Sequence, residues 1–119
     1  MKSRFVSLHP YFKIQPGKID AVKASLPRFA EKTSTEKEVI FYEFSLNGDE
    51  LFCREAYESA NGLLAHLDNV SDLLAELMKI ADVTRLEVHG PAEELAKLKK
   101  PLDALSAVFF ELAFELGEA

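Results

Sequence analysis

His66 is the side chain in this sequence best suited to move a proton near neutral pH, because an imidazole ordinarily titrates there. It ends the run Leu63-Leu64-Ala65-His66, whose spacing of leucines predicts a helix. His66 then falls on the flank of the apolar stripe, where a side chain can reach a pocket between helix and sheet. We expect a general base here. A residue that only lines the pocket, or a buried histidine bonded to a carbonyl or carboxylate, is the alternative.

Glu55 is the second candidate for catalysis, and it lies on a predicted strand in phase with Tyr57. Its carboxylate could orient His66 or bind a substrate hydroxyl. A glutamate on a strand also commonly pairs with a basic neighbour across the sheet, and Arg54 and Arg85 are available for that structural role.

Five further side chains are candidates for substrate binding. Four are aromatic and suit an apolar wall, two of these carry a polar tip, and the fifth is an amide that could hold a substrate oxygen. They are Tyr42, Asn61, Phe44, Phe12 and Tyr57. Core packing or a helix end would explain the same residue types, and the strand face that lines the pocket stays open at this point.

The sequence contains no motif that is typical of a metal or cofactor site. Three histidines and one cysteine occur, without the ligand spacing of a metal site. The five glycines are scattered, so no phosphate-binding loop is formed, and no nucleophile elbow is present. We therefore expect neither a metal nor a cofactor.

The elements that position these residues follow from periodicity and turn signals. Alternation of apolar residues predicts strands over 5–14, 38–46, 50–57, 83–89 and 106–116. Helical spacing predicts a helix over about 17–33 containing Pro27, one broken or two short helices over 59–81, and a short helix after Gly90-Pro91. The order is the ferredoxin-like split βαβ arrangement, an α+β fold with an antiparallel sheet, followed by an extra helix and strand.

Three local signals support these boundaries. Asn47-Gly48 predicts a hairpin turn, because both residue types tolerate positive φ. Ser59 is a good N-cap for the helix that carries His66, and Ser71 resembles a second cap. Pro10, which has no N–H, predicts an edge, a bulge or a bend in the first strand.

Composition indicates one globular domain over residues 1–119. Hydrophobic residues make up 48% and charged residues 29% of the chain. The net charge of −6 disfavours nucleic acid and anionic membrane surfaces as partners. No apolar run reaches the length of a membrane span. The single cysteine, Cys53, excludes an intrachain disulfide, and we expect a cytoplasmic protein.

The predicted sheet face that no helix covers carries too many apolar side chains to remain exposed to water. The residues concerned lie on the central hairpin and the last strand, and they include Ile40, Phe41, Phe109, Phe110, Leu112 and Phe114. Burying such a face against a second copy would remove it from water. We expect a homodimer formed through the open sheet face.

Several short motifs together resemble the antibiotic biosynthesis monooxygenase family of dimeric α+β barrels. They are Pro16-Gly17 at the start of the first helix, Glu55-Ala56-Tyr57-Glu58-Ser59 near the end of the third strand, and the run that ends at His66. Tyr57 stands where a tryptophan is usual, and Ser71 stands where a second histidine or an aromatic residue often follows. The chain contains no tryptophan, which argues against the heme-degrading branch of this fold.

The resemblance implies a pocket between sheet and helices in each subunit. Some family members oxidise quinol-like or polyketide aromatics with O₂ without metal or flavin, and others are isomerases or ligand binders. Two functions therefore stay open. One is a cofactor-independent monooxygenase in which His66 is the base, Glu55 orients it, and Tyr42 or Asn61 holds a substrate oxygen. The other is a dimeric protein that binds a small apolar ligand, such as a quinone or fatty acid, without turnover.

Overall fold

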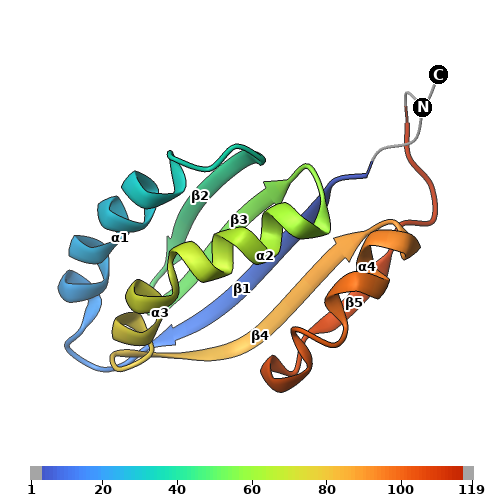
Figure 1. Cartoon of the computed structure of the whole chain (residues 1–119). Coiled ribbons are helices and arrows are strands. Elements are labelled where there is room, and N and C mark those ends of the chain that lie inside the picture. The colour runs from blue at the N-terminus through green and yellow to red at the C-terminus, as the bar shows by residue number, and fades with distance from the viewer. Residues whose placement is uncertain (1–3, 117–119) are drawn as a thin grey trace.

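The computed structural model describes residues 4–116 and contains one five-stranded sheet with helices packed on one face (Figure 1). The elements in chain order are β1 Val6–Ile14, α1 Ile19–Thr33, β2 Val39–Asn47, β3 Glu50–Tyr57, α2 Ala60–Asn69, α3 Ser71–Leu77, β4 Ala81–Gly90, α4 Ala92–Leu98, the 3₁₀ helix η1 Asp103–Leu105 and β5 Val108–Glu111. The strand order is β2-β3-β1-β4-β5. All neighbours are antiparallel except β4 and β5, which run parallel. The predicted ferredoxin-like α+β fold is confirmed.

Strand β1 lies in the middle of the sheet and shows the predicted alternation. Its buried residues are Val6, Leu8, Pro10, Phe12 and Ile14. Pro10 sits inside this central strand, where it cannot donate to a ladder. Its neighbourhood shows the expected irregularity, because the register with β4 shifts between Tyr11 and Phe12. The bulge lets a central strand accommodate proline.

The helices begin and end close to their predicted positions. Helix α1 continues through Pro27, and the region 59–81 forms two short helices. Ser59 caps α2 as predicted, since its Oγ accepts a hydrogen bond from the Gly62 N–H. Ser71 is not a cap: Val70 occupies the N-cap position of α3 and makes no side-chain capping hydrogen bond, and in the first turn the Leu73 N–H donates to Asp72 Oδ1 at 2.9 Å.

Two strand-end predictions need correction. The hairpin loop is formed by Gly48 and Asp49, because Asn47 still pairs with Glu50. Gly48 has a φ of 60°, which suits glycine. The last strand is much shorter than the predicted 106–116, since β5 pairs with β4 over four residues. It lies at a sheet edge, and the ladder ends where the Leu112 N–H bonds the Gly90 carbonyl.

The core lies between the sheet and the helices in two clusters. One joins β1 and β4 to α2 and α4 and centres on Val6, Tyr57 and Leu63. The other joins β1 and β3 to α1 and α3 and centres on Phe12, Phe29 and Leu77. None of the helices within residues 4–116 is long and apolar enough to cross a membrane.

Candidate active site

A cavity of about 340 Å³ lies between the helix-covered face of the sheet and the helices. Its lining residues come from every strand except β5, from α1, α2, α3 and η1, and from residues directly after α3 and η1: Leu8, Pro10, Phe12, Phe29, Tyr42, Phe44, Cys53, Glu55, His66, Leu67, Leu74, Leu77, Met78, Val83, Leu86, Ala104, Leu105 and Ser106. The volume is at the lower end of the range for ligand pockets, about 300–1,000 Å³. The size and the mostly apolar lining suit a small, flat or elongated molecule.

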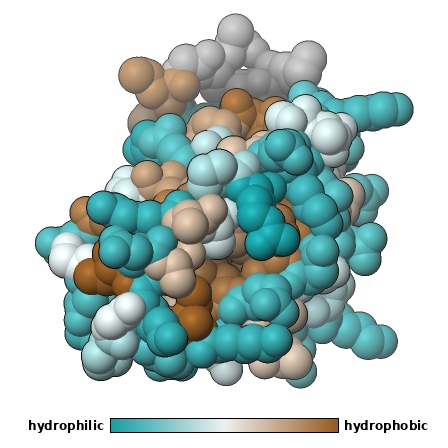
Figure 2. Space-filling model, turned by 90° about the vertical axis from the view of Figure 1, so that its left-hand side faces the viewer, coloured by the Kyte–Doolittle hydropathy of each residue, from teal (hydrophilic) through white to brown (hydrophobic). Residues whose placement is uncertain are grey.

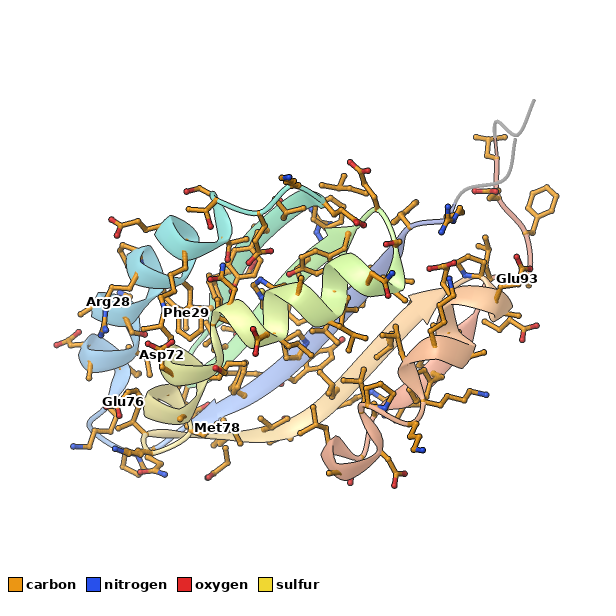
Figure 3. The ribbon with its side chains drawn as sticks, in the orientation of Figure 1. Arg28, Phe29, Asp72, Glu76, Met78 and Glu93 are labelled. Atoms are coloured by element: carbon orange, nitrogen blue, oxygen red, sulfur yellow. The ribbon has the colours of Figure 1, made fainter. Side chains whose placement is uncertain are left out.

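One end of the cavity is open and apolar. Met78 follows α3 and Leu105 ends η1, and their relative exposures are 51% and 47%. Figure 3 shows Met78 and Phe29 at the same end of the molecule, and both line the cavity. Seen from the α1–α3 side, hydrophobic atoms gather in the middle of this face and hydrophilic side chains surround them (Figure 2).

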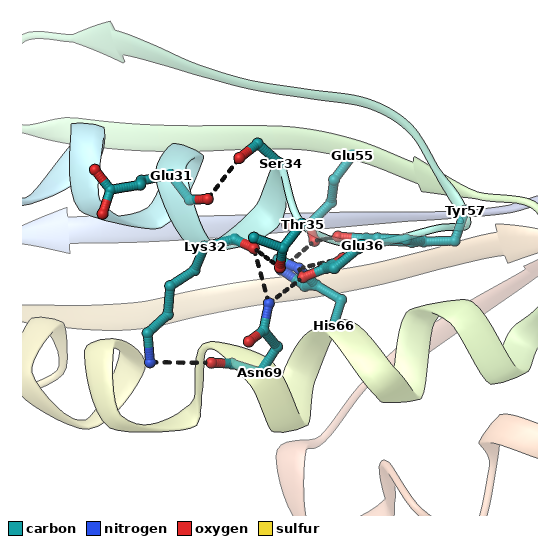
Figure 4. Close-up of polar contacts among 9 residues, drawn as sticks. All are labelled: Glu31, Lys32, Ser34, Thr35, Glu36, Glu55, Tyr57, His66 and Asn69. Atoms are coloured by element: carbon teal, nitrogen blue, oxygen red, sulfur yellow. Dashed lines mark hydrogen bonds and ion pairs between the residues drawn. The ribbon is translucent and has the colours of Figure 1, made fainter.

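The polar part of the cavity lining contains Glu55 and His66, and behind the lining Glu36 also contacts His66 (Figure 4). His66 of α2 is buried, and its Nδ1 lies 2.9 Å from Glu36 Oε2. Its Nε2 lies 3.2 Å from Glu55 Oε1. Glu55 comes from β3, and Glu36 comes from the loop between α1 and β2. Both ring nitrogens therefore face a carboxylate.

Two neutral side chains complete this network. The Tyr57 hydroxyl donates to Glu55 Oε1 at 2.5 Å, so Tyr57 and His66 contact the same oxygen of Glu55. The Asn69 amide donates to Glu36 Oε2 at 2.9 Å and to the Lys32 carbonyl at 2.9 Å. Asn69 thus ties the Glu36 loop to the end of α1 and fixes the carboxylate that holds His66.

The two carboxylates determine the protonation state of His66. Burial acts to lower the pKa of His66, but the hydrogen bonds and charges of Glu55 and Glu36 outweigh it, and the pKa lies above its ordinary value. A protonated ring donates from both nitrogens, whereas a neutral ring leaves one lone pair facing a carboxylate. The imidazolium is therefore the form that matches this geometry.

The aromatic neighbours of His66 stay neutral. Tyr42 packs edge-on against the His66 ring with centroids 5.0 Å apart, and Tyr57 lies 5.1 Å from it. Burial, followed by the charge of Glu55, raises the pKa of both tyrosines and of Cys53. These groups therefore add hydrogen-bonding capacity to the site but no charge.

The structure brings together most of the residues predicted to form the site. Tyr42, Phe44, Phe12, Glu55 and His66 line the cavity, which shows that β2 directs its even-numbered residues 42 and 44 toward the helices. Tyr57 lies behind the lining and bonds Glu55.

Asn61 does not join the site, which corrects its predicted role. Its side chain is exposed on α2 and does not line the cavity. It lies five residues before His66, so the helical turn places the two side chains in different directions. The basic partners suggested for Glu55 are also engaged elsewhere, because Arg54 pairs with Glu43 and Arg85 with Glu87.

Glu36 is the member of the His66 network that the sequence did not predict. It belongs to the loop stretch Glu36-Lys37-Glu38, which has no periodicity and resembles an ordinary solvated loop. Only the chain path after α1 brings its carboxylate beside His66, which lies 30 residues away in sequence. No three His, Cys, Asp or Glu side chains within residues 4–116 are placed to hold a metal ion.

Comparisons with known proteins were made on sequence and on structure. No protein-family model and no curated protein matches the chain. Among solved structures, MupZ from Pseudomonas fluorescens is 43% identical, with a TM-score of 0.93 over 97% of this chain and 95% of that one.

More distant structures share the fold alone. Rv0793 from Mycobacterium tuberculosis is 23% identical with a TM-score of 0.65, over 73% of this chain and 94% of that one. A protein from Chloroflexus aurantiacus J-10-fl, described as a "putative Antibiotic biosynthesis monooxygenase", is 20% identical with a TM-score of 0.61, over 74% and 93%. The chain belongs to the same family as MupZ, and its fold is that of the antibiotic biosynthesis monooxygenase-like family.

Proposed function

We propose that this chain is an enzyme that oxidises a quinol-like or polyketide aromatic substrate with O₂, without metal or flavin. The observation that carries the proposal is the buried Glu55–His66 pair at the polar end of an otherwise apolar cavity. Titratable pairs held in apolar cavities are typical of acid–base catalysis. The name of the Chloroflexus protein, which shares the fold, agrees with the reaction class.

The reaction begins when the Glu55 carboxylate accepts a proton from the activated carbon or hydroxyl of the substrate. The His66 imidazolium, held on its far side by Glu36, donates a hydrogen bond to Glu55 and keeps this carboxylate in place. The substrate anion then gives two electrons to O₂ and forms a carbon–oxygen bond. Loss of water from the resulting peroxide leaves a carbonyl, so one oxygen atom enters the product and the other leaves as water.

The test follows O₂ consumption by the protein with a panel of anthrones and quinols. We expect wild type to consume O₂ with at least one of them. His66→Gln and Glu55→Gln should each lower the rate about 10²–10⁴-fold, the usual effect of losing a general base. Glu43→Gln is the matched control, because Glu43 pairs with Arg54 and lies outside the cavity.

Two outcomes contradict the enzymatic proposal. One is that no compound in the panel raises O₂ consumption above that of the buffer. The other is that both cavity variants keep the wild-type rate.

A dimeric binding protein for a small apolar ligand, such as a quinone or fatty acid, is the second candidate. The arrangement that favours it is that both nitrogens of His66 already contact carboxylates, so the network is complete without a substrate. An apolar fluorescent probe that binds tightly and is displaced by such ligands, without any turnover, would support this function.

We further propose a second copy of this chain as the partner, seated on the open sheet face. An aromatic row crosses that face from β3 to β5. Phe52 stacks on His9, His9 meets His89 edge-on at 4.7 Å, and His89 stacks on Phe110 at 4.7 Å. Phe110 and Phe41 of the same face are 41% and 36% exposed. A symmetric dimer would remove this surface from water.

A further inference from the structure

At the polar part of the cavity, two acidic side chains share one basic side chain. Glu36 and Glu55 supply two carboxylates, and the protonated His66 supplies one cation. Among the described residues, no lysine or arginine lines the cavity. The ammonium of Lys32 approaches from outside, but it pairs with Asp72 and is 39% exposed. The only basic side chain against Glu55 on the cavity lining is therefore His66, which Glu55 shares with Glu36.

Every titratable group that faces Glu55 leaves this imbalance in place. These groups are Tyr42 of β2, Cys53 and Tyr57 of β3, His66 of α2, Glu36 of the α1–β2 loop and, through the sheet, His9 of β1. Tyr42, Tyr57 and Cys53 are neutral at pH 7 because their pKa values are raised. Burial and the neighbouring His89 lower the pKa of His9, so it is also neutral there.

We propose that the cavity selects neutral apolar ligands that carry a hydroxyl donor, and that it rejects the same skeleton when it ends in an ionised carboxylate. The hydroxyl hydrogen is donated to Glu55, whose carboxylate has acceptor capacity beyond its contacts with Tyr57 and His66. A ligand carboxylate would bring a like charge beside Glu55 into a buried site that offers no lysine or arginine. This inference rests on the proposed function, because it names the substrate class of the same cavity, and it favours phenolic ligands over fatty acids.

The test compares three ligands with one skeleton by displacement of Nile red, a neutral probe. They are 2-naphthol, 2-naphthoic acid and 2-methylnaphthalene, measured without O₂ at pH 7.5. We expect the naphthol to bind about 10–100-fold more tightly than 2-methylnaphthalene, as for one hydrogen bond to a charged group, and the naphthoic acid to bind more weakly than the naphthol by a larger factor. The naphthoic acid should bind only in its neutral form. Its affinity should then fall about tenfold for each pH unit above its own pKa near 4, whereas naphthol affinity stays flat until the phenol ionises near pH 10.

Variants identify the group responsible for the selectivity. Glu55→Gln removes the carboxylate at nearly constant side-chain shape. It should reduce the ratio of naphthol affinity to naphthoate affinity to less than about threefold, because the repulsion between Glu55 and the ligand carboxylate is lost. Glu36→Gln removes the same charge from outside the cavity and should reduce the ratio partly. It serves as the second variant if Glu55→Gln does not fold. Glu43→Gln, on the opposite face of the sheet, should keep the wild-type ratio.

Three results overturn the inference: equal affinity of wild type for naphthol and naphthoate at pH 7.5, a ratio unchanged in both Glu55→Gln and Glu36→Gln, or no binding of naphthol at all. The outcome is separable from that of the oxidase test. Selective binding without O₂ consumption in the presence of any anthrone or quinol supports the proposed ligand class and contradicts the monooxygenase function. O₂ consumption without selective binding supports the monooxygenase function and contradicts the proposed ligand class.

Discussion

His66 lies between two carboxylates that come from different parts of the chain, and this position determines its chemistry. Burial disfavours the imidazolium, while Glu55 and Glu36 favour it more strongly, so the pKa is raised in the folded state. A group whose folded-state pKa is raised stabilises the fold below its unfolded pKa. That contribution is lost as pH rises through the folded-state pKa.

The stability of the protein should therefore depend on pH through His66. We expect the difference in unfolding free energy between wild type and His66→Gln to be greatest below pH 6.5, near the unfolded pKa, and to shrink as pH rises above it. Each unit by which the pKa is raised corresponds to about 1.4 kcal/mol. Urea denaturation of both proteins at a series of pH values measures this difference.

The Glu36→Gln variant is the control for this effect of His66 on stability. Removing one of the two carboxylates should lower the pKa of His66, followed directly by NMR of the ring protons, and should weaken the pH dependence. A pH dependence identical in wild type and His66→Gln would show that the network does not hold a proton as inferred.

Among the helices and strands, the start of α2 determines the position of His66 relative to its two glutamates. Ser59 caps the helix and donates to Glu38 Oε1 at 2.6 Å, so the helix is tied to the loop that enters β2. Gly62 allows this close approach, because an added Cβ would lie 2.7 Å from the Cβ of Glu38. The same helix carries His66 one turn later, so the approach of α2 to β2 brings the ring to Glu36 and Glu55.

Gly62→Ala should therefore destabilise the protein, although Gly→Ala inside a helix usually stabilises by about 1 kcal/mol. The clash involves the base of the Glu38 side chain rather than its flexible tip, so the helix or the loop must move, at a cost of about 1–3 kcal/mol. Thermal unfolding checks the sign, and Asn61→Ala, at an exposed position on the same helix, should change stability by less than about 0.5 kcal/mol. A stabilised Gly62→Ala variant would contradict the proposed close packing.

The open sheet face is the feature that matters at the scale of the whole molecule. Its aromatic row runs through four neighbouring strands, and Arg85 lies 6.0 Å from the centre of the Phe110 ring. Helices cover only the other face, so this row faces outward in a single chain (Figure 1). The proposed dimer follows from this asymmetry between the two faces.

Phe110→Asp should dissociate the dimer or cause aggregation, because it would bury an unpaired charge in the interface. Light scattering should give about twice the chain mass of 13.3 kDa for wild type and a lower mass or aggregates for the variant. Ile19→Asp is the matched control, since it adds the same charge at the start of α1, on the helix side of the molecule. A wild-type protein that is a monodisperse monomer in solution would contradict the proposed dimer.

Alternation of side chains in β1, the Ser59 cap and the leucine spacing around His66 are local patterns, and the sequence alone predicted them correctly. Each depends on residues within a turn or a strand, where the period of the backbone dictates which side chains share a face. The fold class followed from the order of these elements. The end of β5 could not be predicted, because the apolar run continues to Leu116 and only the loss of a strand neighbour after Gly90 ends the ladder.

The composition of the site was decided by tertiary structure. His66 and Glu55 could be identified from their types and their elements, but their direct contact depends on how α2 lies over β3. Glu36 carries no signal in the sequence, since an acidic loop residue looks the same whether it faces water or a histidine. It becomes part of the site because the chain returns after α1 to the polar end of the cavity, where burial turns a weak surface charge into a strong hydrogen-bonding partner.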